Sequence, residues 1–244
     1  MESASPFLIE VVASTVESCI AAERGGAGRI ELCTALATAG LTPGAPLLRA
    51  VKRAVKIPVV AMIRPREGDF FYSRDEMDLM KAEMDDLGAA GADGFVFGLL
   101  SADMEIDIEK TSELVRHSAH LPCVFHRAID CTKNLLESVD AIVQTGCIRI
   151  LTSGGAASGT EGIENILAMQ QRAGNDLTVM PGGGLRPESF ERVLRHELSE
   201  YHLSGRSPRP ALSSSSLFDL NRFETDMHQI RTVATMCERF YRSN

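Results

Sequence analysis

Two arginines and an aspartate follow a short apolar run in the stretch Val59–Ser73. Arg64 and Arg66 flank a proline, and Asp69 comes directly after a glycine. A guanidinium group presents a planar fork of donors that suits a carboxylate or a phosphate group. The pattern therefore fits an anion-binding site at the end of a buried strand. It fits equally well an arginine–aspartate network that only holds the loop in place.

Residues able to transfer protons follow other short apolar runs. Glu10, Glu31, His126 and Asp130 are candidate catalytic residues, because carboxylate and imidazole groups can act as general acids and bases. Glu10, Glu31, His126 and His202 could also ligate a divalent cation. Alternatively, they could form a buried network of ion pairs with nearby arginines, and this network is the minimum that their positions predict.

A second group of residues could hold an anionic ligand. The glycines Gly182–Gly184 precede a predicted helix, so their backbone N–H groups could approach an anion. They could also form a tight turn that requires positive φ angles. The residues that we expect around a small anionic ligand are Arg64, Arg66, Asp69, Arg127, Ser153, Gly182, Gly183, Gly184 and His202.

Cys33 is the cysteine best placed for chemistry among the six in the chain. No two of them form a Cys-x-x-Cys pair, which argues against a zinc ribbon and a thioredoxin-type motif. A thiolate is a soft ligand that suits Cu(I), whereas a single buried cysteine usually packs as a small apolar residue. A tight copper site would need another sulfur atom, or His126 or His202, close to Cys33.

Eight short apolar runs must position these residues, and helical patterns separate them. The predicted strands are Phe7–Val12, Arg29–Leu32, Val59–Ile63, Gly94–Phe97, Cys123–Phe125, Arg149–Leu151, Leu177–Met180 and Tyr201–Leu203. Alternation of strands and helices predicts βαβ units and a parallel sheet. Eight units in 244 residues predict an α/β fold, a (β/α)₈ TIM barrel that forms a single domain over residues 1–244. In such a barrel the active site lies at the carboxyl ends of the strands, where the candidate residues fall.

Serine residues predict where several helices begin. Ser14, Ser73 and Ser158 each precede a glutamate by three residues, which is the pattern of a capping box. We expect the last helix near Phe223–Arg239. We expect a mobile loop over Gly205–Ser216, since this segment has low sequence complexity.

The composition argues against several classes of protein. The net charge is −8 and there is no basic block, so we expect no nucleic-acid partner. No apolar run approaches the ~20 residues that cross a bilayer, and the acidic N-terminal segment does not resemble a signal peptide. We therefore expect a cytoplasmic protein with no membrane partner.

Six motifs follow one another along the chain: Arg29–Cys33, Gly40–Pro43, Met62–Ser73, Phe125–Asp130, Arg149–Gly154 and Met180–Gly184. Together they resemble the CutC family of copper homeostasis proteins. The resemblance implies a cytosolic barrel, usually oligomeric, that is linked to copper tolerance or trafficking. The family's proposed Cu(I) ligands are two cysteines near the ends of the first two strands. The second falls on Cys33, and the first would fall where this sequence has Val12.

Two functions stay open at this point. The first is a cytosolic copper homeostasis protein that binds Cu(I) weakly through Cys33, without turnover. The second is a TIM-barrel enzyme that acts on a small anionic metabolite, with phosphorylated compounds included, through an Arg/His/Glu pocket. The expected partner is accordingly a copper ion or a small anion, and we expect a homo-oligomer, either a dimer or a tetramer.

Overall fold

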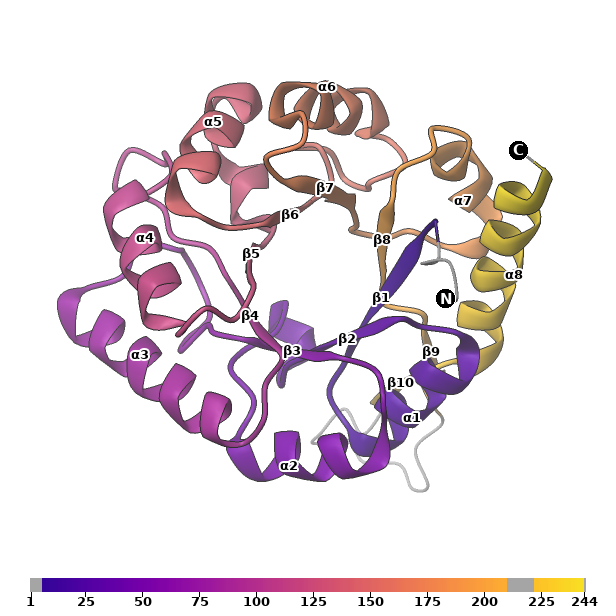
Figure 1. The fold of residues 1–244 in the computed structure, drawn as a ribbon, viewed down its shortest axis with the longest axis horizontal. Coiled ribbons are helices and arrows are strands. Elements are labelled where there is room, and N and C mark those ends of the chain that lie inside the picture. The colour runs from indigo at the N-terminus through magenta and orange to yellow at the C-terminus, as the bar shows by residue number, and fades with distance from the viewer. Residues whose placement is uncertain (1–5, 210–221, 244) are drawn as a thin grey trace, which may run out of the picture.

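A computed structural model describes residues 6–209 and 222–243 of the chain. Eight parallel strands curl into a ring, and the helices surround the ring on its outside (Figure 1). Along the sheet the strand order is β7-β6-β5-β4-β3-β2-β1-β8, and β7 and β8 lie side by side where the ring closes. The predicted (β/α)₈ barrel is therefore confirmed.

The strands agree closely with the apolar runs of the sequence. Their interiors are almost entirely buried, because one face packs on the helices and the other lines the barrel. The strands of the barrel are β1 (Leu8–Ala13), β2 (Arg29–Leu32), β3 (Val59–Met62), β4 (Gly94–Phe97), β5 (Cys123–Phe125), β6 (Arg149–Thr152), β7 (Thr178–Pro181) and β8 (Glu200–Leu203).

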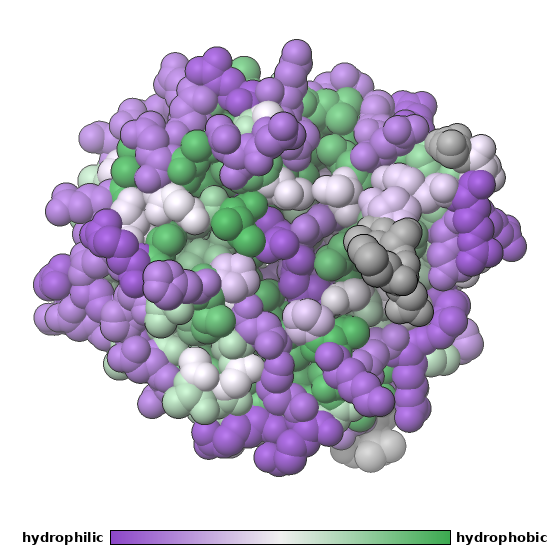
Figure 2. Space-filling view, in the orientation of Figure 1, coloured by the Kyte–Doolittle hydropathy of each residue, from purple (hydrophilic) through white to green (hydrophobic). Residues whose placement is uncertain are grey.

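Each α-helix packs an apolar face on the outside of the strands. The helices are α1 (Val16–Gly25), α2 (Ala45–Ala54), α3 (Arg74–Ala89), α4 (Ile108–His117), α5 (Leu135–Thr145), α6 (Ile163–Ala173), α7 (Pro187–Leu194) and α8 (Met227–Ser243). Two 3₁₀ helices, η1 (Leu36–Thr38) and η2 (Arg127–Cys131), lie in the loops after β2 and β5. Hydrophilic residues gather around the outer rim of the face seen in Figure 2, and hydrophobic residues are more frequent nearer the axis.

The capping box at Ser73 is confirmed, and the other two predicted boxes are wrong. Ser73 and Glu76 exchange both hydrogen bonds at the start of α3. The cap of α1 is Thr15 instead of Ser14, since its side chain accepts the Ser18 N–H at 3.0 Å. Ser158 accepts the Glu161 N–H in a turn that precedes α6, and the helix itself begins only at Ile163.

The segment after β8 differs from the prediction. Arg206–Arg209 forms a strand, β9, which pairs antiparallel with β10 (Arg222–Thr225), so these residues are not part of a loop. The rest of the predicted mobile loop, residues 210–216, lies outside the described residues. The last helix begins at Met227 rather than near Phe223, because Phe223 belongs to β10 and Asp226 accepts the His228 N–H at the helix start.

The inside of the barrel has two chemically different halves. Apolar side chains from β3, β4 and β5 form one half, where Val60, Met62, Val96 and Val124 pack together. Charged side chains from β1, β2, β6 and β8 form the other half. Among the helices of the described residues, none has the length and apolar character that a membrane span requires.

Candidate functional site

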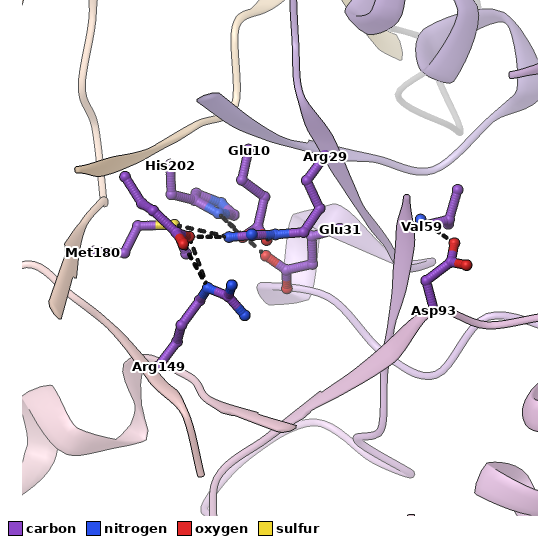
Figure 3. Close-up of polar contacts among 9 residues, drawn as sticks. Glu10, Arg29, Glu31, Val59, Asp93, Arg149, Met180 and His202 are labelled. Atoms are coloured by element: carbon purple, nitrogen blue, oxygen red, sulfur yellow. Dashed lines mark hydrogen bonds and ion pairs between the residues drawn. The ribbon is translucent and has the colours of Figure 1, made fainter. Parts of the chain in front are cut away.

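A network of charged residues lies in the polar half of the barrel (Figure 3). Its members are all nine-tenths or more buried, apart from Arg149, which is half-buried. They come from the inward faces of four strands, where side chains alternate with those that face the helices. The residues of this lumen network are Glu10, Arg29, Glu31, Arg149, Glu200 and His202.

Two arginines and two glutamates balance one another's charge in this network. The Arg29 guanidinium donates to the carboxylates of both Glu10 and Glu200. Arg149 donates its Nε–H to the two oxygens of Glu200, each at 2.8 Å. The Arg29 guanidinium also lies 3.7 Å from the sulfur of Met180. Because buried charges need partners, this part of the network is a requirement of the fold.

His202 lies between the carboxylates of Glu10 and Glu31. Its Nδ1 is 2.8 Å from an oxygen of Glu10 and 3.4 Å from an oxygen of Glu31. The register of the sheet produces this contact, because His202 is paired with Glu10 across β8 and β1. In Figure 3 the three side chains point toward one another.

The pKa values of the three groups are driven apart by their surroundings. Burial raises the pKa of Glu31 to about 7. Burial also acts to raise the pKa of Glu10, but the positive charge of Arg29 and the hydrogen bond from His202 lower it to about 2. Burial acts to lower the pKa of His202, whereas its hydrogen bond to Glu10 and the charge of Glu31 raise it overall. Glu10 thus stays ionised while Glu31 and His202 together hold a proton near neutral pH.

The same three residues could in principle hold a cation. One ligand atom from each of Glu10, Glu31 and His202 lies within 4.8 Å of the others. Carboxylate and imidazole groups suit several divalent metals. However, Glu10 is already paired with Arg29, so only the Glu31 carboxylate is left to balance a double positive charge. A shared proton therefore fits the charge of this cluster better than a divalent cation does.

Arg64 holds the loops at the mouth of the barrel together. Its guanidinium donates to the carbonyl oxygens of Thr38, Gly40 and Gly68 at 2.7 to 3.1 Å. The side chain is buried, and in the described part of the chain all of its hydrogen bonds go to carbonyl groups. The positive charge of Arg64 is therefore buried without a carboxylate beside it.

Arg66 and Asp69 lie at the surface of the same loop. Arg66 pairs with Asp69 at 2.9 Å and also with Glu76, which forms the capping box of α3 with Ser73. The hydrogen bond from Arg66 lowers the pKa of Asp69 below its ordinary value. These contacts agree with the interpretation that the two residues hold the loop.

His126 lies beside Arg64, away from the lumen network. Its ring is 5.0 Å from the ring of Phe70, centroid to centroid, and its Nδ1 accepts the Ala128 N–H at 3.2 Å. Burial and the charge of Arg64 lower the pKa of His126 to about 3, so the imidazole is neutral. The structure thus brings His202, and not His126, to the carboxylates with which the sequence grouped both histidines.

Asp130, Arg127 and Ser153 form a separate cluster at the ends of β5 and β6. Asp130 accepts hydrogen bonds from Ser153, Gly155 and Arg127. Arg127 also donates to the Ser153 hydroxyl at 2.9 Å. Because the carboxylate of Asp130 is surrounded by donors, its contacts orient the loops rather than leave it free as a base.

The glycines after β7 bring two parts of the site together. A Cβ added to Gly183, whose φ is +74°, would lie 3.0 Å from the Arg127 guanidinium carbon. A Cβ added to Gly182 would lie 3.2 Å from the Cβ of His202. The glycine turn is thus required by its backbone conformation and by close neighbours. Because residue 182 is a glycine, it places no side chain against His202.

Cys33 is fully buried against the apolar half of the barrel. Its sulfur lies 3.9 Å from the Ala13 carbonyl oxygen, and its side chain packs with Val60 and Met62. Burial and the charge of Glu31 raise the pKa of the Cys33 thiol well above its ordinary value. Val12, which is only partly buried, packs against the same cluster.

Three residues of these clusters were not singled out from the sequence. Glu200 could have been found, since it is two residues from His202 and therefore faces the same side of β8. Met180 could not, because its contact is with Arg29, which is distant in the chain. Tyr72, whose ring centre is 5.1 Å from the guanidinium carbon of Arg66, could not either, because that contact depends on the path of the loop.

A family model and similar curated proteins point to the same family. A family model described as the CutC family matches residues 7–207. A mouse protein named copper homeostasis protein cutC homolog is 44% identical over 204 residues, covering 83% of this chain and 75% of the mouse protein. The human protein of the same name is 43% identical over 208 residues, with coverage of 85% and 76%.

A solved structure agrees with this assignment. The crystal structure of a CutC copper homeostasis protein from Streptococcus agalactiae superposes with a TM-score of 0.76 at 29% identity. The match covers 80% of this chain and 97% of the bacterial one.

Proposed function

This chain belongs to the CutC family. We propose that it serves copper homeostasis indirectly, as an enzyme that transfers a proton to or from a small anionic metabolite. The names of its relatives supply the copper context. The chemistry inside the barrel supports the enzymatic part. A cytoplasmic location and a homo-oligomer stay predictions.

The contact of His202 with both Glu10 and Glu31 carries this proposal. A general acid or base works best when its pKa lies near the pH of the solution, and the pKa of Glu31 is about 7. Two carboxyl groups whose pKa values differ this much are typical of an acid–base site. In the proposed reaction Glu31 exchanges the proton, His202 shares it, and the ionised Glu10 holds the imidazole in place.

The substrate would approach past the glycine turn and Val12. Gly182 carries no side chain over His202, and Val12, near the carboxyl end of β1, is only partly buried and lies on the same face of the strand as Glu10. Gly183 lies against Arg127, whose guanidinium could contact an anionic group at the mouth. This path connects the candidate anion-binding residues with the lumen network.

Binding of Cu(I) through Cys33 is the other function that the family resemblance implies. The donor set does not fit a site with two thiolates, because Val12 is apolar and the buried Cys33 thiol has a raised pKa. Thiolate is the form of cysteine that binds metal. We therefore expect at most weak Cu(I) binding, and no step of the proposed reaction involves copper.

Exchange of protons with deuterated water tests the proposal without knowledge of the substrate. The protein is incubated in D₂O with the small metabolites of a cell extract, and mass spectrometry detects compounds that gain deuterium. We expect incorporation with the unaltered chain and its loss in Glu31→Gln. Glu83→Gln is the matched control, since Glu83 is a half-buried glutamate on α3 that also has a raised pKa. Equal incorporation with Glu31→Gln, or none with any compound, would contradict the proposal.

A further inference from the structure

We infer that Arg64, Tyr72 and His126 form a binding site for a carboxylate group of the ligand, and that the ring of Phe70 closes it. The inference rests on the proposed function and names the chemical class of its substrate. The site lies at the mouth of the same barrel, on the side of β3 and β5.

Three buried polar atoms in this place have no hydrogen-bond partner. They are Arg64 Nε, the Tyr72 hydroxyl and His126 Nε2, and they make up three of the four such side-chain atoms found in the described residues. The three residues are only 5%, 1% and 5% exposed. A buried polar group without a partner costs free energy, so three together point to a ligand that pairs with them.

All three atoms can donate a hydrogen bond. The Nε of an arginine always carries a hydrogen, and a tyrosine hydroxyl can donate its own. Because His126 Nδ1 accepts the Ala128 N–H, the hydrogen of the neutral imidazole is on Nε2. Together these three groups offer three hydrogens, on Arg64 Nε, the Tyr72 hydroxyl and His126 Nε2, which is complementary to an anion.

Contacts with one another and with Phe70 place these residues together. The guanidinium carbon of Arg64 is 5.2 Å from the centre of the Phe70 ring, and that ring is 5.0 Å from the ring of His126. Burial raises the pKa of Tyr72 to about 12, although the charges of Arg64 and Arg66, and the interaction of the Tyr72 hydroxyl with the Arg64 side chain, act to lower it. The Tyr72 side chain therefore lies close to the same guanidinium.

The charge of the site favours a carboxylate over a phosphate group. Arg64 brings one positive charge, which no carboxylate of the described residues pairs with, and His126 is neutral. A carboxylate would balance this charge, whereas a doubly charged phosphate would leave an excess negative charge in a buried place. The N-terminus of α3, which could otherwise attract phosphate, is already capped by Ser73 and Glu76.

Phe70 occupies the position in which the ligand would reach the donors. It contacts the side chains of Arg64 and His126, and its carbonyl oxygen accepts the Leu100 N–H at 2.9 Å. The ring must move aside when the carboxylate binds. Arg64 lies two residues beyond the end of β3, whereas Val60, the partner of Glu31 across the sheet, lies within that strand. The carboxylate would therefore anchor the ligand at a distance from Glu31.

Titration with acetate and with inorganic phosphate, followed by calorimetry at pH 7, tests the inference on the full chain. We expect Phe70→Ala to bind acetate more tightly than the unaltered chain and more tightly than it binds phosphate. Phe71→Ala is the matched control, because Phe71 is the neighbouring phenylalanine and is 49% exposed. It should leave acetate binding unchanged. Failure of Phe70→Ala to bind acetate, or tighter binding of phosphate, would overturn the inference.

Tyr72→Phe gives a second, independent readout. In the Phe70→Ala background it should weaken acetate binding about tenfold, since it removes a hydrogen bond to a charged group. In the otherwise unaltered chain without acetate, it should leave the Tm unchanged or raise it, because the hydroxyl has no partner to lose. A lower Tm would indicate a structural hydrogen bond and would overturn the inference.

Glu31→Gln separates this inference from the proposed function. It should remove deuterium incorporation while acetate binding to its combination with Phe70→Ala persists. Persistent binding without any catalysed exchange would reject the proposed reaction and keep the carboxylate site. Catalysed exchange without acetate binding would reject the carboxylate site and keep the proposed reaction.

Discussion

Arg29 is the residue on which the charges of the lumen depend, because it pairs with both Glu10 and Glu200. Replacing it by methionine keeps much of the side-chain volume but leaves two buried carboxylates without their partner. We expect Arg29→Met to lower the free energy of unfolding by about 3–5 kcal/mol in urea denaturation. Arg172→Met, which breaks an exposed pair with Asp140, is the control and should leave the unfolding midpoint unchanged. Equal effects of both changes would contradict this account of the lumen.

Replacing His202 and replacing Glu10 should shift the pKa of Glu31 in opposite directions. The carboxyl carbon of Glu31, followed by ¹³C NMR, should titrate near pH 7 in the folded protein. The positive charge of His202 lowers this pKa and the negative charge of Glu10 raises it. Thus His202→Asn should move the midpoint up and Glu10→Gln should move it down. A midpoint near 4.5 in the unaltered protein would refute the assignment of Glu31 as the proton-exchanging group.

Val12 gives the sharpest test of copper binding. We expect the reduced, unaltered chain to bind Cu(I) weakly in competition with a chelator, since Cys33 is a single buried thiol. Val12→Cys would add a second thiol beside the cluster of Cys33 and should bind Cu(I) far more tightly, because thiolates suit Cu(I). The additional change Cys33→Ala should remove this gain, and Cys131→Ala, at the exposed cysteine, should not. Tight stoichiometric binding by the unaltered chain, lost in Cys33→Ala, would instead support a direct copper role.

Among the elements, β4 and β5 end close together, where Gly98 directly follows β4 and packs against His126, which directly follows β5. A Cβ at position 98 would lie 2.3 Å from His126 Nδ1, so Gly98→Ala must push the imidazole away. We expect a loss of about 1–3 kcal/mol in the free energy of unfolding, as is usual for overpacking. Gly88→Ala is the control, because its added Cβ would meet only Phe95 at 3.9 Å. This change lies inside α3 and should stabilise the protein by about 0.5–1 kcal/mol.

The effect of Gly98→Ala can also be measured directly on the side chain of His126. The imidazole signals of His126 in an NMR spectrum should shift in Gly98→Ala and stay in place in Gly88→Ala. If both changes left the stability and the His126 signals alone, the packing of the two strands would not depend on this glycine.

At the scale of the whole molecule, buried groups with shifted pKa values should set how stability depends on pH. Glu10 and His126 have lowered pKa values, about 2 and about 3, so the unfolded chain binds more protons than the folded one above these values. Their contribution therefore rises with pH, up to the ordinary pKa of each group. Glu31 and His202 have raised pKa values, so their contribution falls as the pH increases through them.

The combined effect is a stability maximum on the acid side of neutrality. We expect the free energy of unfolding to rise from pH 3 to about 4.5, to change little up to about 6.5, where Glu31 and His126 oppose each other, and then to fall. One proton contributes a slope of at most about 1.4 kcal/mol per pH unit. Urea denaturation over this range measures it, and Glu31→Gln should make the fall above pH 6.5 shallower. A steady rise to pH 8 would show that Glu31 and His202 do not hold a proton in the folded state.

The order and the type of the elements of the barrel could be predicted from the amino-acid sequence. Buried parallel strands are short runs of apolar residues, so Arg29–Leu32, Gly94–Phe97 and Cys123–Phe125 could be located to the residue. Their alternation with helices was enough to predict the closed barrel, and Ser73 marked the start of α3 because its capping interaction is local. The predicted starts of α6 and α8 were wrong, because these helices begin at Ile163 and Met227, after residues that belong to a turn and to a strand.

The contacts among the polar residues could not be predicted in this way, because they depend on the folded barrel. Glu10, Arg29 and His202 are distant in sequence, and their contact depends on the register by which β8 and β2 flank β1. The sequence could group His126 with the glutamates by residue type, but its strand ends on the other side of the barrel, beside Arg64 and Phe70. Local patterns determine strands and caps because those interactions span a few residues. The proton-sharing network depends on burial and on charges brought together by closure of the barrel, which no local pattern encodes.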